Sequence, residues 1–186
     1  MGLPALSLEP EARSLLENIK QKVSNEIEKS KKIPVSVLLW GPAPDDPSEI
    51  AQLRVKLRSE LTACGHLAQF SEELIETESG VSIKTQQLIH AQQFDMVVSM
   101  PCTPGSIGEL HDFISDNRIN KKLLVFLNED FQYGYQFQSV VATSSYLTYK
   151  TITYKGYGEL HIVEESVTSE IQKIREIKYF NQGRWI

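Results

Sequence analysis

The segment from Phe94 to Leu110 holds the residues of this chain that are best placed to do chemistry. A short apolar run ends at Pro101, and a loop of small residues continues as far as Gly105. A helix is predicted to begin near Ser106 and to carry Glu109 in its first turn. Backbone N–H groups point outward at such a helix start, which favours anionic or sugar-phosphate ligands. The pattern therefore makes Glu109 a candidate for chemistry on a ligand that this loop holds.

The same residues also have a purely structural interpretation. Ser106 would be the N-cap of the helix, and Glu109, three residues later, would complete a capping box. A glutamate in a first turn also complements the helix dipole. Gly105 and Gly108 weigh against this alternative, because two glycines in one turn disfavour a helix start unless something approaches the backbone closely. The sequence favours a functional site and leaves the structural alternative open.

Composition and charge narrow the class of protein. The 186 residues, of which 41% are hydrophobic, suffice for one ordinary domain with a sizeable core. The net charge of −5 argues against general nucleic-acid binding, and the apolar runs are too short to cross a membrane. Cys64, Cys102 and the four histidines show no zinc-binding spacing, so neither a metal nor another cofactor is expected. The first residues lack the pattern of a secretory signal, so the expected location is cytoplasmic.

Helical and strand patterns alternate along the chain. Apolar residues recur three or four positions apart in five segments, which predicts helices at residues 10–30, 48–63, 82–93, 106–117 and 166–180. Runs rich in apolar residues, or in Thr and Tyr, predict strands at residues 35–40, 67–70, 96–100, 123–127 and 146–154, and residues 160–163 are expected to pair back. The alternation predicts a Rossmann-like α/β fold with an open, mostly parallel five-stranded sheet, helices on both faces and an extra N-terminal helix.

The predicted organisation places one α/β domain between two short terminal segments. The expected boundaries are residues 1–32 for the N-terminal helix, 33–180 for the domain and 181–186 for a C-terminal tail. Open α/β sheets bind ligands outside the carboxyl ends of their strands, where the strand order reverses. Four loops should meet there, at residues 41–47, 71–73, 101–109 and 128–135. This topology places Glu109 in a cleft.

Other polar residues near these loops have open interpretations. Arg54 and Arg58 either neutralise a phosphate or form salt bridges with Glu60 and Glu49. Cys102 lies in the ligand loop, but a cysteine nucleophile needs an activating base that the sequence does not show. Three histidines are interpreted as structural or solvent-facing: His66, His90 and His111.

Three features together resemble the nucleoside 2-deoxyribosyltransferase-like superfamily. They are the small-residue loop Gly41-Pro42-Ala43-Pro44 after the first strand, the third strand that follows Asp95, and the motif Gly105-Ser106-Ile107-Gly108-Glu109-Leu110. The superfamily includes deoxynucleotide N-glycosidases, and NAD-cleaving Toll/interleukin-receptor domains are more distant relatives in architecture. The resemblance covers roughly residues 34 to 130.

A second, partial resemblance is to the SLOG or lysine-decarboxylase-like nucleotide-binding family. Its Pro-Gly-Gly-x-Gly-Thr loop followed by Glu is similar to Pro104-Gly105-Ser106-Ile107-Gly108-Glu109. The second adjacent glycine and the threonine are missing here. The basic residue that the family has in the preceding helix is also missing, because residues 82–93 contain Lys84 as their only lysine or arginine.

The first resemblance implies an N-glycosidase or (deoxy)ribosyl transferase that acts on a nucleoside, a nucleotide or an NAD-like substrate, with Glu109 as the catalytic carboxylate. Helix N–H groups and Ser106 would hold a 5′-phosphate or a sugar hydroxyl. The substrate-binding residues that it implies are Gly41, Pro42, Glu72, Pro104, Gly105, Ser106 and Gly108. The aromatic residues that it makes available to stack on the base are Trp40, Phe70, Tyr133 and Tyr135. The carboxylates that it makes available to grip a ribose hydroxyl are Asp45, Asp46, Glu72 and Glu73.

A non-catalytic function is the alternative. Pro42 and Pro44 in the first loop cannot donate backbone hydrogen bonds to a ligand. The fold would then serve as a nucleotide-binding or nucleotide-sensing module in a bacterial signalling or defence system.

The terminal helices indicate self-association. Both carry an apolar stripe, and only one further helix is needed to cover the predicted sheet. The other stripe is expected to form a homodimer, in which Tyr133 or Trp185 of the partner subunit would complete the cleft. The alternative is that both helices pack on their own sheet.

Overall fold

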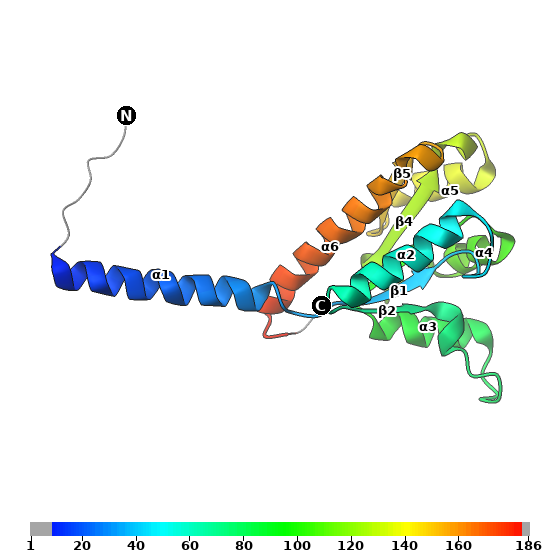
Figure 1. The fold of residues 1–186 in the computed structure, drawn as a ribbon. Coiled ribbons are helices and arrows are strands. Elements are labelled where there is room, and N and C mark those ends of the chain that lie inside the picture. The colour runs from blue at the N-terminus through cyan, green and yellow to red at the C-terminus, as the bar shows by residue number, and fades with distance from the viewer. Residues whose placement is uncertain (1–8, 184–186) are drawn as a thin grey trace.

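The computed structural model describes residues 9–183, apart from the side chain of Tyr157, and contains the predicted five-stranded sheet (Figure 1). All pairings are parallel, and the strand order is β2-β1-β3-β4-β5. The strands are β1 (Ser36–Trp40), β2 (Leu67–Phe70), β3 (Met96–Ser99), β4 (Leu123–Asn128) and β5 (Lys150–Tyr154). The three central strands are apolar runs buried on both faces, as parallel sheets require.

Helices cover both faces of the sheet. One face packs against α2 (Glu49–Ala63) and α6 (His161–Phe180), and the other packs against α3 (Ile83–Gln93), α4 (Pro104–Phe113) and α5 (Tyr135–Ser144). Each helix contributes apolar residues to one of two core layers, for example Leu57 and Ile171 in the first layer and Leu110 and Val140 in the second. The predicted α/β architecture is therefore confirmed.

The remaining helix, α1 (Pro10–Ser30), extends away from the sheet at the amino ends of the strands (Figure 1). None of its residues is buried. It meets the domain at the end of α6, where the Tyr179 hydroxyl donates a hydrogen bond to Glu26 over 3.1 Å. Since α6 covers the sheet and α1 does not, the alternative in which both terminal helices pack on the sheet is wrong.

Three predictions of secondary structure need correction. Residues 160–163 do not pair back as a strand, because α6 already begins at His161. The helix predicted at 106–117 begins at Pro104 and ends at Phe113. The helix α5 was not predicted, because Phe131, Tyr133, Tyr135 and Phe137 alternate with polar residues, a spacing typical of a strand.

Two sequence predictions fall outside the described residues. They are the absence of a secretory signal, which concerns residues 1–8 among others, and the contribution of Trp185 to a cleft. Within residues 9–183, no helix is both long enough and apolar enough to span a membrane.

Candidate functional site

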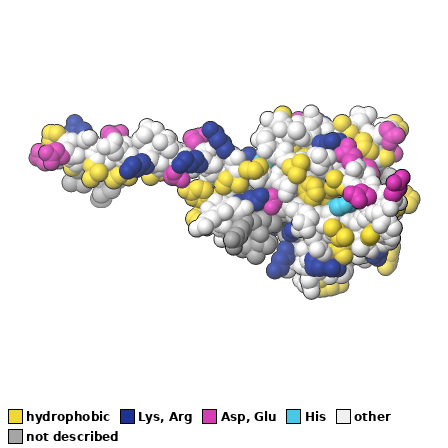
Figure 2. All heavy atoms as spheres, turned by 90° about the horizontal axis from the view of Figure 1, so that it is seen from below, with side chains coloured by type: hydrophobic (Ala, Val, Ile, Leu, Met, Phe, Trp, Pro, Cys, Tyr) yellow, Lys and Arg dark blue, Asp and Glu magenta, His cyan; other side chains and the backbone are white. Residues whose placement is uncertain are grey.

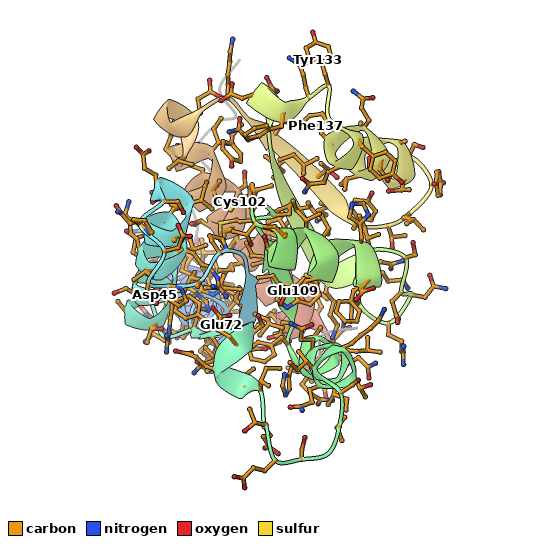
Figure 3. The ribbon with its side chains drawn as sticks, turned by 90° about the vertical axis from the view of Figure 1, so that its right-hand side faces the viewer. Asp45, Glu72, Cys102, Glu109, Tyr133 and Phe137 are labelled. Carbon is orange, nitrogen blue, oxygen red and sulfur yellow. The ribbon has the colours of Figure 1, made fainter. Side chains whose placement is uncertain are left out.

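The strand order reverses between β1 and β3, and the loops after these two strands flank the point of reversal. This is the place where open α/β sheets bind ligands. Figure 3 looks onto this edge of the sheet and shows Glu109 from α4 and Glu72 from the loop after β2 as close neighbours. The topology thus brings the predicted catalytic residue to the predicted edge.

The start of α4 differs from the prediction in a way that matters for Glu109. Thr103 is the N-cap, and its side chain and that of Ser106 form the capping box. Pro104 occupies the first helical position, where a missing N–H is harmless. Glu109 therefore lies in the second turn and neither caps the helix nor belongs to the capping box. The structural interpretation of Glu109 as a capping residue is wrong.

Glu109 is half-buried, and its carboxylate accepts a hydrogen bond from the amide of Gln87 on α3. Burial and the nearby negative charge of Glu72 raise the pKa of Glu109 to about 7, against the opposing influence of Arg54 and of the Gln87 hydrogen bond. A carboxyl group with a pKa near neutrality is typical of catalytic sites, although structural networks also produce such shifts. Glu109 can thus exchange a proton at physiological pH.

Arg54 holds the neighbouring loops together. Its guanidinium is completely buried and donates to both carboxylate oxygens of Glu72, each over 2.6 Å. It also donates to the carbonyl oxygens of Leu39 and Pro42, again over 2.6 Å each. Although burial opposes it, this pairing holds the pKa of Glu72 below its usual value. The bidentate pair ties the loop after β2 to the end of β1 and sets a charged Glu72 beside Glu109.

Most of the predicted substrate-binding residues lie along this edge, but several have structural partners. A Cβ atom on Gly41 would lie 3.2 Å from the Arg54 side chain, so a larger residue there would press on Arg54. The Pro42 carbonyl accepts the Arg54 hydrogen bond. Ser106 is buried, and its hydroxyl accepts from the backbone N–H groups of Cys102 and Thr103. The Ser106 hydroxyl is therefore occupied inside the protein rather than turned toward a ligand.

Gly105 and Gly108 behave differently. A Cβ atom built on either residue would meet no other atom within 4 Å, and neither residue has a positive φ angle. The protein itself therefore does not require glycine at either position. Pro104 beside them is exposed. Their roles toward a substrate remain predictions.

Two of the aromatic residues expected to stack on a base are part of the core instead. Trp40 is fully buried and packs against Phe113 with ring centroids 5.5 Å apart. Phe70 is buried between the guanidinium groups of Arg54 and Arg58, which lie 4.4 and 4.6 Å from its ring centre. Neither ring is accessible to a ligand.

The predicted salt-bridge partners of Arg54 and Arg58, Glu60 and Glu49, are also wrong, because Arg54 pairs with Glu72 and Arg58 pairs with Glu73.

The other two aromatic residues are accessible. Tyr133 and Tyr135 are 90% and 85% exposed, in the segment that follows β4. Figure 3 shows Tyr133 at the far end of this edge from Glu72. Stacking by Tyr133 therefore requires a ligand that extends along this edge, and the Tyr135 ring is stacked on His111 of α4 with ring centroids 6.5 Å apart.

The remaining carboxylates and the thiol do not make a second catalytic centre. Interactions with the side chain and the backbone N–H of Ser48 lower the pKa of Asp46, whereas Asp45 is exposed. Partial burial of the Cys102 thiol, together with the charge of Asp46, raises its pKa, which is the opposite of what a thiolate nucleophile needs. Among the described residues, no group of three or more His, Cys, Asp or Glu side chains could hold a metal ion.

A pocket of about 190 Å³ also opens at this edge. Ile107 lines it, whereas Glu109, two residues further along α4 and therefore about 200° around the helix, does not. In Figure 3 Cys102 and Phe137, which line the pocket, lie on one side of Glu109, and Glu72 lies on the other. The start of α4 thus separates an apolar pocket from the Glu109–Glu72 pair.

Gln87 and the buried geometry of Arg54 were not predicted. Arg54 follows Ile50 by four residues and precedes Leu57 by three, so the helical pattern places it on the buried side of α2. That signal was available in the sequence. The contact between Gln87 and Glu109 joins two residues that are 22 positions apart on different helices, and no local pattern indicates it.

Comparison of the sequence with protein-family models and with curated proteins gives no significant match.

Proposed function

We propose that this protein cleaves the N-glycosidic bond of a nucleoside-like substrate, by hydrolysis or by transfer, with Glu109 as the catalytic carboxylate. The observation that carries the proposal is the environment of Glu109. The side chain lies at the reversal of strand order, is held by a neutral amide and has a pKa near 7. The likeness of its motif to the deoxyribosyltransferase-like superfamily agrees with this role.

The chemistry needs one well-placed carboxylate. When the bond between C1′ and the base nitrogen breaks, its electron pair leaves with the base and positive charge develops on the sugar. An ionised Glu109 stabilises that charge or adds to C1′. In hydrolysis, water then supplies a hydroxyl to C1′ and a proton to the departing base, and in transfer a second base takes the place of water.

The charges near Glu109 favour a substrate without a phosphate at this point. Arg54 and Arg58 are paired with Glu72 and Glu73. The hydroxyl groups at the start of α4 bond one another and the nearby backbone. A neutral nucleoside, or the nucleoside portion of a larger substrate, fits these surroundings better than a monophosphate does.

The test is to incubate the protein with nucleosides, nucleoside monophosphates and NAD and to follow the free base by chromatography. The wild-type protein should release base, and Glu109→Gln should be slower by on the order of 100-fold or more. Gln87 can still donate its hydrogen bond to the new amide, so the fold should persist. Glu176→Gln, on the distant end of α6, is the matched control. Equal rates for Glu109→Gln and wild type would show that the assignment is wrong.

The alternative function is a nucleotide-binding or nucleotide-sensing module without turnover. The proline-rich loop favours it, since the Pro42 carbonyl is taken by Arg54 and prolines supply no donors. Calorimetry separates the two functions. Micromolar binding of an intact ligand, with no base released over hours, supports the sensing module, and no binding of any ligand removes both.

We also propose that the chain forms a homodimer through a terminal helix, and the exposed stripe of α1 supports this assembly.

A further inference from the structure

The α1 stripe is an apolar surface that the domain leaves uncovered. It consists of Leu15, Leu16, Ile19, Val23 and Ile27, which are between 38% and 61% exposed. Figure 2 shows apolar side chains at the surface along the projecting helix. In proteins, most of the stability of a helix comes from packing its apolar face against a partner rather than from intrinsic propensity. The stripe therefore needs a partner outside its own domain.

The spacing of the stripe suits pairing with a second copy in the opposite direction. Leu15, Ile19, Val23 and Ile27 form one ridge with a constant spacing of four residues. The ridge is symmetric about position 21, so reversing a second copy brings Leu15 opposite Ile27 and Ile19 opposite Val23. The same surface on both partners then matches itself, as a two-fold interface requires.

The charges along α1 favour the same orientation. Residues 9–18, at the outer end, contain three glutamates and one arginine. Residues 19–32, next to the domain, contain five lysines and two glutamates. Antiparallel pairing places the acidic end of each helix beside the basic end of the other, whereas parallel pairing places like charges together.

An apolar groove of about 370 Å³ lies at the base of the stripe, where α1 meets the end of α6. It is lined by Lys22, Val23, Glu26, Ile27, Ser30 and Tyr179. In the antiparallel arrangement, Leu15 and Leu16 of the partner subunit reach this groove, since they lie opposite Ile27.

We propose that α1 pairs antiparallel with α1 of a second copy of this chain, with Leu15 facing the partner's Ile27 and Ile19 facing the partner's Val23. The assembly is independent of any chemistry at Glu109. Because α1 leaves the domain at the amino ends of the strands, the two candidate sites lie at the far sides of the dimer (Figure 1). Tyr133 of one subunit therefore does not complete the site of the other, contrary to the sequence-based expectation.

Light scattering on the full chain at low micromolar concentration tests the assembly. The expected mass is twice the 21.1 kDa of one chain. Ile19→Glu/Val23→Glu should halve that mass without changing the near-ultraviolet circular dichroism of the domain, because neither residue is buried and α1 contains no aromatic residue. The control Gln21→Glu/Ser24→Glu adds the same charge on the other side of α1 and should remain dimeric.

The light-scattering experiment overturns the proposal if the wild type is monomeric, if the dimer survives the stripe substitutions, or if the control disrupts the dimer equally. Leu15→Glu/Ile27→Glu repeats the test at the ends of the stripe. If both stripe variants unfold the domain while the control does not, the stripe packs within its own chain, and the proposal fails.

Cross-linking tests the orientation. In a background of Cys64→Ser/Cys102→Ser, chains with Leu15→Cys are mixed with chains carrying Ile27→Cys and treated with a short thiol-specific cross-linker. Antiparallel pairing gives cross-linked dimers in the mixture and few from either variant alone. Parallel pairing gives them from each variant alone, and that result overturns the antiparallel arrangement.

Discussion

At the scale of single residues, Glu109 makes the stability of the protein depend on pH. Its pKa is raised from 4.5 to about 7, mainly by burial. Between these values the native state binds a proton that the unfolded chain has released. The contribution of Glu109 to the free energy of unfolding therefore falls as the pH rises from 4.5 to 7, and this contribution changes no further above that window.

Glu109→Gln removes this dependence. The variant and the wild type should be about equally stable at pH 4.5, and the variant should be more stable by about 2 kcal/mol at pH 8. Urea unfolding at both pH values measures the difference, with Glu176→Gln as the control. A stability difference that is the same at both pH values would contradict the raised pKa.

Arg54 and Arg58 offer a second comparison at this scale. Both stack on Phe70 and both pair with a glutamate, but only Arg54 is fully buried. Arg54→Met leaves two carbonyl groups without their donor and should lower the free energy of unfolding by about 3 kcal/mol. Arg58→Met should lower it by less than about 1 kcal/mol. Denaturant unfolding measures both losses. Equal losses in the free energy of unfolding would contradict the expectation that the buried Arg54–Glu72 pair matters more than the exposed Arg58–Glu73 pair.

The candidate site was predictable from the sequence only in part. Glu109 and Glu72 were both named, and the strand order brings them to one edge. The aromatic residues at the ends of β1 and β2 were misinterpreted, because a strand residue next to a loop faces either the core or a ligand, and the sequence does not say which. Trp40 and Phe70 face the core.

At the scale of elements, the capping box of Thr103 and Ser106 fixes where α4 begins and therefore places Glu109 in the second turn. Thr103→Ala and Ser106→Ala should each lower the free energy of unfolding by about 1 kcal/mol. Because the two side chains bond each other, the double variant should lose less than the two single losses combined. Ser144→Ala, at the end of α5, is the control. Strictly additive losses in urea unfolding would contradict the reciprocal capping.

Element starts were predicted less well than element types. The start of α4 was placed two residues late because Ser106 was taken as the N-cap, although Thr103 before Pro104 is an equally good signal. In α5, Tyr135 is exposed and Phe137 is half-buried, and Val140 is the one residue of this helix that the structure shows as buried. Local pattern therefore failed where few side chains face the core.

At the scale of the whole molecule, the architecture was predictable because several segments of the sequence indicate it independently of one another. The runs that form β1, β3 and β4 are apolar without alternation, and helical segments separate them. The separation of functions was not predictable. The candidate site and the α1 stripe lie at opposite ends of the strands, so changes to one need not disturb the other (Figure 1).

The strand order also affects how this chain reaches its native state. In the centre of the sheet, Val37 of β1 lies opposite Met96 of β3, with α2, β2 and α3 between them in sequence. Such a pairing gains no contacts until the long intervening segment has closed into a loop. During synthesis the apolar strand β1 therefore remains unpaired with β3 until the chain beyond β3 has been made. This is the stage at which the folding chain is most exposed to aggregation.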